Sequence, residues 1–410
     1  MKLLILGASN LQLNAIRRAK AARHIVIVSD YYPDPPGKAY ADCHEQVSTF
    51  DAEANIAVAA KHGVDGVMTL GTDQPVLTVA RVAEALRLPA LIDVPTALAV
   101  THKKIMKQGF QDAGIPTVNY RLLREDFHDR ELEGLGFPVV VKPLDSQGQR
   151  GVYKLESIAA IREVFRDVLA FSRESEILAE EYYPSDEITV SGWVTAGEAR
   201  LIAVVDRISL VNKRHIGICI AHHFPSRHLP ARYPEILELS RRIVVAFGIG
   251  DGPIYFQMLI GGDGIKINEI ACRIGGAYED IYLERATGID PLGMLIEASL
   301  GGTPDCRALR NFQLLQCQKK LSVELFFSDP CQVASLTDID RLSRLPGVVK
   351  AGYNLKPGDR VGAIVNATGR AGFMIIEGES DRELRERIER AYSELSIYDN
   401  SGINRLRRFQ

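Results

Sequence analysis

Short apolar runs alternate with a helical spacing of apolar positions over residues 1–92. The runs at 2–6, 24–29 and 64–70 are β-prone, and apolar residues recur every three or four positions between the first two. Strands that alternate with helices predict a doubly wound parallel sheet, so we expect a Rossmann-like α/β domain in this part of the chain.

The turn after the first apolar run bears on nucleotide binding. From Gly7 to Gln12 it has the sequence GASNLQ, which lacks the second and third glycines of the G-x-G-x-x-G pattern. It therefore gives little support for a nicotinamide or flavin cofactor. Asp30 ends the second run and matches the acidic position of dinucleotide-binding folds by topology only. We expect a domain without a tight nucleotide site, whose strand ends line a substrate pocket.

A helix is expected over 93–113, with Thr96 and Thr101 as capping candidates. Two adjacent lysines, Lys103 and Lys104, lie in this segment. Adjacent lysines form a solvated helix face far more often than they form a binding site, so both interpretations stay open at this point.

The stretch 252–276 predicts a β-hairpin, because two apolar β-prone segments flank the turn sequence GGDG. Gln257 and Glu269 lie on opposite strands at similar distances from the turn, so strand pairing brings them together. Buried polar groups need a partner or a metal, and two oxygen donors suit Mg²⁺. Arg273 follows four residues later, and it would face the phosphate groups that complete the coordination of the same Mg²⁺ ion. The alternative is an ordinary hairpin in which Glu269 pairs with a lysine.

Lys142 ends a strand of consecutive valines, and the small-residue loop DSQGQRG follows it at 145–151. Ser146, Gly148 and Gly151 let backbone N–H groups curl around an anion, while a lysine adds a point charge for phosphate. The loop is not a P-loop, because no G-K-[ST] sequence closes it. The alternative is a long hairpin turn with a surface lysine.

Acidic and aromatic residues mark a linker between two strands after residue 176. Glu180, Glu181 and Tyr183 precede Pro184, and Glu187 follows it. Backbone groups of such a linker read an adenine edge, and Glu187 would take the ribose hydroxyls. Alone, the segment is equally a charged interdomain hinge.

Basic residues gather between 207 and 223 and suit an anionic substrate or the γ-phosphate. Adjacent histidines on a strand point in opposite directions, so the pair in this segment is not expected to chelate one metal. A further cation for an anionic substrate, Arg285, lies in the segment 278–285. The basic residues of the 207–223 segment are Arg207, Lys213, Arg214, His215, His222 and His223.

The last hundred residues predict a small α+β cap that begins at about residue 306. Upstream of it, helices are expected at 233–247 and 290–300. The cap itself is expected to contain strands near 321–327, 360–366 and 372–377, and a charged helix at 381–395.

Composition excludes several classes of protein. The chain is 46% hydrophobic and 25% charged with a net charge of −3, and it has no long basic run, so nucleic acid is not an expected partner. No 18-residue apolar run predicts a membrane span, and the apolar start is too short for a signal peptide. The six cysteines show neither metal-ligand spacing nor disulfide-like density, which favours a reducing cytoplasm. Cys272 has no partner base in the sequence, so no catalytic role is expected for it.

Taken together, these stretches resemble the ATP-grasp superfamily, and the resemblance covers nearly the whole chain. The hairpin looks closest to the carboxyaminoimidazole synthetase and carbamoyl-phosphate synthase branch, whereas the C-terminal region looks more like ATP-grasp amino-acid ligases. The motifs are THKKIM (101–106), VVVKP (139–143), SQGQRGV (146–152), EEYY (180–183), INEIACR (267–273), LPGV (345–348), KPGDRVG (356–362) and RAGF (370–373).

The resemblance implies a domain order and a set of site residues. A Rossmann-like domain (1–92) would precede a two-lobed ATP-grasp clamp (93–305, with a mobile ATP lid at about 115–180) and a C-terminal α+β domain (306–410). ATP would bind to Lys103, Lys142, Ser146, Gly148, Gly151, Glu180, Glu181, Tyr183 and Glu187, Mg²⁺ or Mn²⁺ to Gln257 and Glu269, and Arg273 and Lys213 would act in catalysis.

Two positions depart from the pattern of most members. Gln257 stands where most carry Glu as the first metal ligand, and Ala271 stands where many carry Asn. The site therefore has fewer anionic donors than a two-glutamate site, and whether one or two metal ions bind stays open.

The activity that the resemblance implies is ATP-dependent joining of a carboxylate and an amine through an acyl phosphate, with release of ADP and phosphate. One alternative is a bicarbonate- or formate-activating enzyme of nucleotide metabolism. Another is an ATP-binding regulatory protein without turnover, which Gln257 permits. The expected partners are small-molecule carboxylates and amines, with no nucleic acid and no membrane, and a homodimer would be usual for the family.

Overall fold

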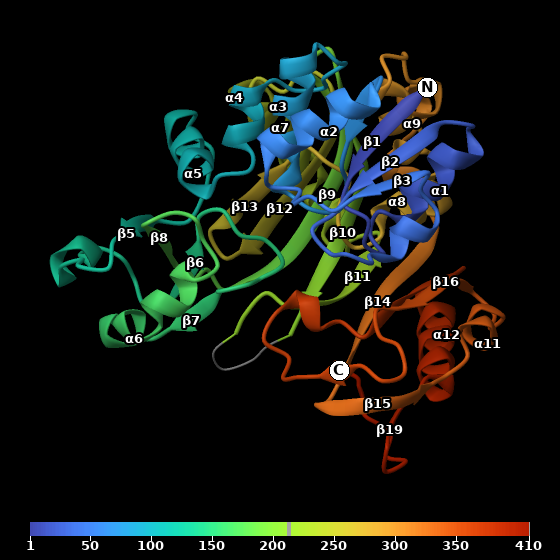
Figure 1. Ribbon diagram of the computed structural model, residues 1–410. Helices are drawn as coiled ribbons and strands as arrows, with labels where there is room; N and C mark the ends of the chain where they lie inside the picture. The colour runs from blue at the N-terminus through green and yellow to red at the C-terminus, as the bar shows by residue number, and fades with distance from the viewer. Residues whose placement is uncertain (211–214, 410) are drawn as a thin grey trace. The chain divides into compact units, whose positions relative to one another are not determined.

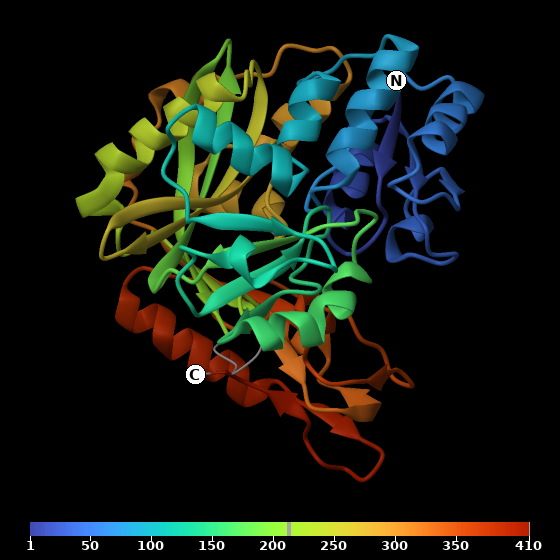
Figure 2. The same ribbon diagram turned by 90° about the vertical axis from the view of Figure 1, so that its left-hand side faces the viewer.

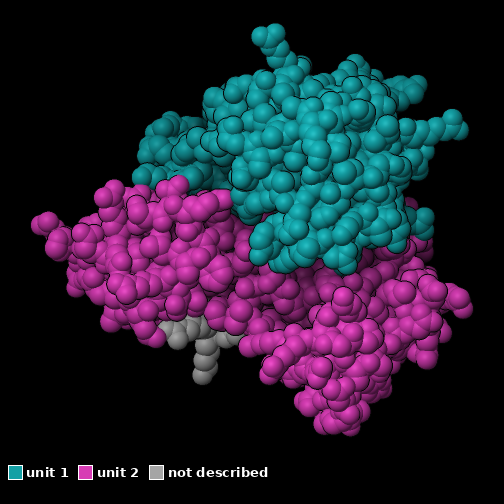
Figure 3. All heavy atoms as spheres, in the orientation of Figure 1, with its two compact units in different colours: residues 1–117, 189–204, 230–315 teal, residues 118–188, 205–229, 316–410 magenta. Residues whose placement is uncertain are grey.

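The structure, a computed structural model, describes residues 1–210 and 215–409 (Figure 1). The chain divides into two compact units, which interleave along the sequence (Figure 3). The three predicted domains stay a prediction. Among the described residues, no helix has the length and apolar character that crossing a bilayer requires. The first unit comprises residues 1–117, 189–204 and 230–315, and the second comprises 118–188, 205–229 and 316–410.

The first unit begins with the parallel sheet that the alternating pattern predicts. Its strand order is β3-β2-β1-β4, and Figure 1 shows β1, β2 and β3 side by side. Leu4 and Leu6 of β1 pack with Val58 of α2 and Val82 of α3, so these two helices share one core with the sheet. The elements are β1 (Lys2–Leu6), α1 (Leu13–Ala21), β2 (Ile25–Ser29), β3 (Cys43–Glu45), α2 (Ala52–His62), β4 (Gly66–Met68) and α3 (Pro75–Leu86).

The helix predicted over 93–113 is two helices, so that prediction is wrong in its continuity. They are α4 (Val94–Ala99) and α5 (Lys103–Asp112). The predicted caps are wrong as well: the side chain of Asp93 caps α4 by accepting from the Thr96 N–H, and no side-chain cap bond begins α5. The Thr101 hydroxyl donates to the Ala97 carbonyl, so it closes the end of α4.

The second half of the first unit contains the predicted hairpin, β12 and β13, beside residues of β9 and β10. The turn of this hairpin falls within the predicted GGDG sequence, because β12 ends at Gly261 and β13 begins at Gly264. Strands β9 and β10 contribute residues to both units. The elements are β9 (Ser185–Thr195), β10 (Glu198–Ser209), α7 (Leu229–Ala246), β12 (Gly252–Gly261), β13 (Gly264–Ala271), α8 (Glu279–Thr287), α9 (Pro291–Ser299) and α10 (Arg307–Asn311).

The second unit contains an antiparallel sheet in the order β5-β8-β6-β7, with α6 packed on it. Val139 and Val141 of β6 are fully buried against Phe165 of α6, because alternate residues of a strand face the same side. Lys142, the next residue, therefore points to the other face. The elements are β5 (Tyr120–Leu123), β6 (Val139–Pro143), β7 (Tyr153–Leu155), α6 (Ile158–Leu169) and β8 (Ile177–Glu181).

The C-terminal part of the second unit joins strands in the order β11-β14-β18-β16. Helix α12, the long red helix of Figure 2, packs against β14 and β18 with its apolar stripe of Leu384, Ile388 and Tyr392. The strand predicted at 360–366 is wrong in length, because only Arg360–Val361 pair. The elements are β11 (Cys219–Phe224), β14 (Lys320–Ser328), β15 (Cys331–Leu336), α11 (Ile339–Ser343), β16 (Val348–Tyr353), β17 (Arg360–Val361), β18 (Gly372–Gly378), α12 (Asp381–Glu394), β19 (Ile397–Asp399) and β20 (Leu406–Arg407).

Close packing between β4 and the end of α9 gives a prediction for stability. A Cβ added at Gly66 would lie 2.0 Å from the Ser299 carbonyl oxygen, so the backbone must move. Gly66→Ala should destabilise the protein by about 1–3 kcal/mol, which a fall in the thermal unfolding midpoint would report. Gly250→Ala is the control, because a Cβ there has no neighbour within 4 Å. Equal midpoints for the two variants would contradict the prediction.

Candidate active site

The hairpin register brings the two predicted metal ligands together. Gln257 of β12 lies directly opposite Glu269 of β13. A β-bulge follows, because Met258 pairs with Ile267, and Asn268 is the extra residue. The Asn268 amide donates to the Gln257 Oε1 at 3.4 Å, while the Gln257 amide donates to the Tyr255 hydroxyl at 3.2 Å. The hairpin therefore presents one amide oxygen and one carboxylate side by side.

Lys103 completes this group within the first unit. Its Nζ lies 3.0 Å from the Glu269 Oε1, and its side chain is only 10% exposed. The alternative interpretation of the hairpin is that Glu269 pairs with a lysine, and the structure shows this contact. The partner is the first residue of α5, one of the lysines that the sequence predicts to bind phosphate. Lys104 is exposed on the same helix.

Arg273 lies just past the hairpin and forms a buried ion pair that the sequence did not predict. Its Nη2 and Nε lie 2.5 and 2.7 Å from the Asp73 Oδ1, and its guanidinium lies 4.5 Å from the Tyr255 ring centroid. Burial alone would lower the pKa of Arg273, but Asp73 raises it, so the group stays charged. Asp73 belongs to the GTDQP turn after β4, which the sequence marked only as a strand end.

Two buried carboxyls begin α8, close in sequence to Arg273. The Ser191 hydroxyl and the Gly275 N–H donate to the Glu279 Oε2, at 2.8 and 2.9 Å. Burial raises the pKa of Glu279 and raises that of Asp280 to about 7. The Asp280 Oδ2 is buried without a hydrogen-bond partner among the described residues. The sequence placed this segment near a substrate pocket but named neither acid.

The second unit holds the other predicted phosphate-binding lysine. The Lys142 Nζ lies 2.5 Å from the Glu180 Oε2, and the two side chains are 10% and 4% exposed. They lie on the adjacent strands β6 and β8, where Lys142 is opposite Leu178 and Glu180 is opposite Val140. A nearly buried lysine paired with a carboxylate is not the surface lysine of the alternative interpretation.

The loop after Lys142 contains three residues with left-handed backbone conformation. Gly148, Gln149 and Gly151 have φ of +70°, +56° and +69°, in the left-handed region where glycine is favoured. Asp145 anchors the start of the loop, because its carboxylate accepts from the Ser172 hydroxyl and from Arg173. Ser146, also predicted to contact the nucleotide, is buried here.

The predicted adenine linker uses its acids as structural acceptors. Glu181 accepts from the Gly136 N–H and from the Asn119 amide, both at 2.8 Å, so its side chain closes neighbouring loops. Tyr183 follows β8 and accepts, through its carbonyl, from the Ser185 hydroxyl. Glu187, the predicted ribose ligand, forms an ion pair with the buried Arg207.

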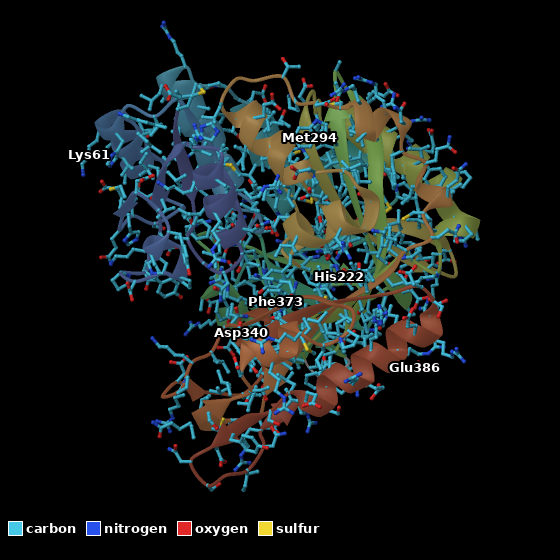
Figure 4. All side chains as sticks on the ribbon, turned by 90° about the vertical axis from the view of Figure 1, so that its right-hand side faces the viewer. Lys61, His222, Met294, Asp340, Phe373 and Glu386 are labelled. Atoms are coloured by element: carbon cyan, nitrogen blue, oxygen red, sulfur yellow. The ribbon has the colours of Figure 1, made fainter. Side chains whose placement is uncertain are left out.

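The remaining candidates are basic residues of the 207–223 segment and Cys272, and the structure describes only some of them. Lys213 and Arg214 lie outside the described residues. His222 is buried while His223 is exposed on the same strand, so their predicted opposite orientation is confirmed (Figure 4 labels His222). Burial holds the pKa of His222 well below its usual value, so this residue does not supply the cation that the basic segment predicts. Burial likewise raises the pKa of the Cys272 thiol to about 12.

Comparison with known families found two matches. Residues 135–279 match the family described as ATP-grasp domain. This part of the chain is therefore similar to an ATP-grasp domain. Residues 324–399 match a second family, described as L-amino acid ligase C-terminal domain 2. The ATP-grasp match contains Lys142, the glycine loop, the linker and the whole hairpin. Both parts of the predicted resemblance are confirmed.

Individual relatives are distant. The chain is 22% identical to dapdiamide A synthase of Enterobacter agglomerans and 25% identical to an L-arginine-specific L-amino acid ligase of Bacillus subtilis. These alignments cover 67% and 65% of this chain and 66% and 64% of the relatives, just under two thirds of their length. The structure of an L-amino acid ligase from Bacillus licheniformis superposes with a TM-score of 0.81 at 18% identity, covering 97% of this chain and 98% of that one. That likeness confirms the predicted α/β fold class.

The raised pKa of Asp280 predicts a loss of stability with rising pH. The folded protein keeps this proton up to about pH 7, whereas an unfolded aspartate releases it near 3.8. Stability from this group is therefore complete below about pH 4 and falls as pH rises through 7, by at most about 4 kcal/mol. Asp280→Asn keeps the size of the side chain and should flatten the fall in unfolding midpoint between pH 5 and 8.

Asp263→Asn, in the exposed hairpin turn, is the matched control for this comparison. It should lose as much stability as the unmodified protein over the same pH range. An Asp280→Asn profile that coincides with the control profile would show that Asp280 does not carry the effect.

Proposed function

We propose that this protein is an ATP-dependent carboxylate–amine ligase, which joins two small molecules through an amide or peptide bond and releases ADP and phosphate. One observation carries the proposal: Gln257 and Glu269 are register partners, with Lys103 on Glu269, inside a hairpin that belongs to the ATP-grasp match. The C-terminal match to the L-amino acid ligase domain favours amino acids as substrates.

The second unit supplies several nucleotide contacts in this proposal. Lys142 neutralises phosphate charge, and the loop 146–151 offers backbone N–H groups to the same polyanion. Backbone groups of residues 180–183 face the adenine, and Glu187, held by Arg207, accepts from the ribose hydroxyls. Glu180 competes with phosphate for Lys142, so nucleotide binding exchanges one buried ionic contact for another.

The donors of the hairpin fit a hard divalent cation. Gln257 and Glu269 offer oxygen ligands, which Mg²⁺ and Mn²⁺ both take, and two protein ligands leave room for phosphate oxygens and water. The ion supplies charge neutralisation at the transferring phosphoryl group. The Lys103 ammonium already offsets the charge of the Glu269 carboxylate.

The proposed reaction needs a carboxylate that accepts the phosphoryl group, an amine that attacks the resulting acyl phosphate, and protection of that intermediate from water. The substrate carboxylate oxygen attacks the γ-phosphorus, the bond to ADP breaks, and an acyl phosphate forms. An amine nitrogen then attacks the acyl carbon, phosphate leaves, and the amine proton passes to solvent or a nearby base. Arg273 remains charged beside Asp73, so it suits the anionic oxygen that develops in the second step.

A second candidate function differs from this proposal in the acid that ATP activates. Formate-dependent phosphoribosylglycinamide formyltransferases also align with the chain, and the hairpin resembles a bicarbonate-activating branch. A formate- or bicarbonate-activating enzyme is therefore the second candidate. A homodimer in a reducing cytoplasm is the setting that we propose for either activity.

Removing the hairpin carboxylate tests the nucleotide site. Glu269→Ala should lower ATP turnover by about 100- to 1000-fold, because it removes the anionic donor of the cation site. ADP release is the measurement, and an unchanged far-ultraviolet circular dichroism spectrum confirms the fold. Asp263→Ala, in the turn of the same hairpin, should leave turnover unchanged. Normal ADP release by Glu269→Ala would remove the cation assignment.

A phosphate-release screen tests the substrate class. With ATP and Mg²⁺, pairs of amino acids should release phosphate at least about tenfold above the rate without substrate, and mass spectrometry should detect a dipeptide. Formate and bicarbonate, each with glycinamide-type amines, form the second arm of the screen. Turnover in that arm alone would favour the rival activity, and ATP binding without ADP release in any arm would favour a regulatory protein.

A further inference from the structure

Three side chains of different chemistry converge in the N-terminal sheet, in a part of the chain that the proposed ligase reaction does not use. Cys43 and Glu45 are the first and last residues of β3, so they lie two positions apart on the same face of that strand. His62 is the last residue of α2 and reaches them from the helix end. All three side chains are partly buried, and His44 between the two strand residues points to the other face.

The ligand atoms of these residues are close enough to share one ion. The Cys43 Sγ lies 3.8 Å from both the His62 Nε2 and the Glu45 Oε1. The His62 Nε2 lies 2.6 Å from the same Glu45 oxygen, which is a hydrogen-bond distance. One sulfur, one nitrogen and one oxygen therefore form a small triangle whose sides are all below 4.8 Å.

Zinc geometry can be compared with this triangle directly. Tetrahedral bonds of about 2.3 Å to sulfur and about 2.1 Å to nitrogen and oxygen place the sulfur about 3.6 Å from each of the other two ligands. The two observed sulfur distances of 3.8 Å are already close to that value. Only the distance between the His62 Nε2 and the Glu45 Oε1 has to increase, by about 1 Å or less, and rotation of the two side chains is enough for that change.

We propose that Cys43, Glu45 and His62 form a binding site for a borderline-soft divalent cation of the zinc class, with water in the fourth position. Thiolate, imidazole and carboxylate are the three ligand types that Zn²⁺ prefers, whereas Mg²⁺ would avoid the sulfur. The site lies apart from the hairpin donors Gln257 and Glu269, so it is a second, chemically distinct metal site on the chain.

The donor set offers two negative charges to a divalent ion. One is the Glu45 carboxylate, and the other is the Cys43 thiolate, which forms when a bound cation displaces the thiol proton to solvent. Lys61 is the competitor, because its Nζ lies 2.7 Å from the Glu45 oxygen that the metal needs. Its side chain is 65% exposed and lies at the edge of the N-terminal ribbon in Figure 4, so it can turn into solvent.

Cobalt titration of the full-length, tag-free, metal-depleted protein tests the site. Co²⁺ replaces zinc in such sites, and a thiolate ligand produces a charge-transfer band in the near ultraviolet. One equivalent of Co²⁺ should produce this band, and Zn²⁺ should abolish it. Cys43→Ser should lose the band, His62→Gln should weaken Co²⁺ binding at least about tenfold, and Cys331→Ser, another partly buried cysteine, should keep the band.

A gain-of-affinity variant covers the case in which ligand variants fail to fold. Lys61→Met removes the competing cation from the surface and should tighten Co²⁺ binding by about two- to fivefold, the range expected for loss of an exposed ion pair. Lys20→Met is its control, because Lys20 pairs with Asp42 and does not touch the three ligands. Absence of the charge-transfer band, its survival in Cys43→Ser, or equal affinities for the two lysine variants would overturn the proposal.

Discussion

The register of one hairpin is the constraint on which the candidate active site depends. Gln257 lies opposite Glu269 only because the extra residue, Asn268, shifts the pairing in the middle of the strands. Side chains alternate across a strand with a period of two, so a slip of one residue would send the carboxylate to the opposite face. Lys103 would then lose its partner, and both groups would stay poorly solvated at a high cost in free energy.

Charge pairing recurs at several ionised groups in the interior of this protein. Arg273 is balanced by Asp73, Lys142 by Glu180, and Arg207 by Glu187. Such pairs add little net stability, because desolvation offsets most of the attraction. They hold cations and acids in fixed positions, which is what a site for a polyanionic nucleotide requires. Asp280 differs from these pairs, since burial raises its pKa to about 7.

The N-terminal sheet shows how a domain without a glycine-rich nucleotide turn still presents chemistry at its edges. The GTDQP turn after β4 supplies Asp73 to Arg273. At the other edge, β3 and the end of α2 bring a thiol, a carboxylate and an imidazole together. Both groups of side chains depend on the two edge strands, β4 and β3. Loops and helix ends gather where the strands of a parallel sheet end, so side chains from separate elements meet there.

The sequence by itself determined the elements with strong local patterns: the alternating strands and helices, the hairpin with its turn, and the order of the ATP-grasp motifs. Tertiary structure decided what local patterns do not encode. The break between α4 and α5 and the Arg273–Asp73 pair, 200 positions apart, depend on packing partners distant in sequence. Cys43 and His62 have no metal-ligand spacing, and only the strand–helix crossover makes them neighbours. Periodicity reports which face of an element is buried, whereas side-chain partners follow from how separate elements pack.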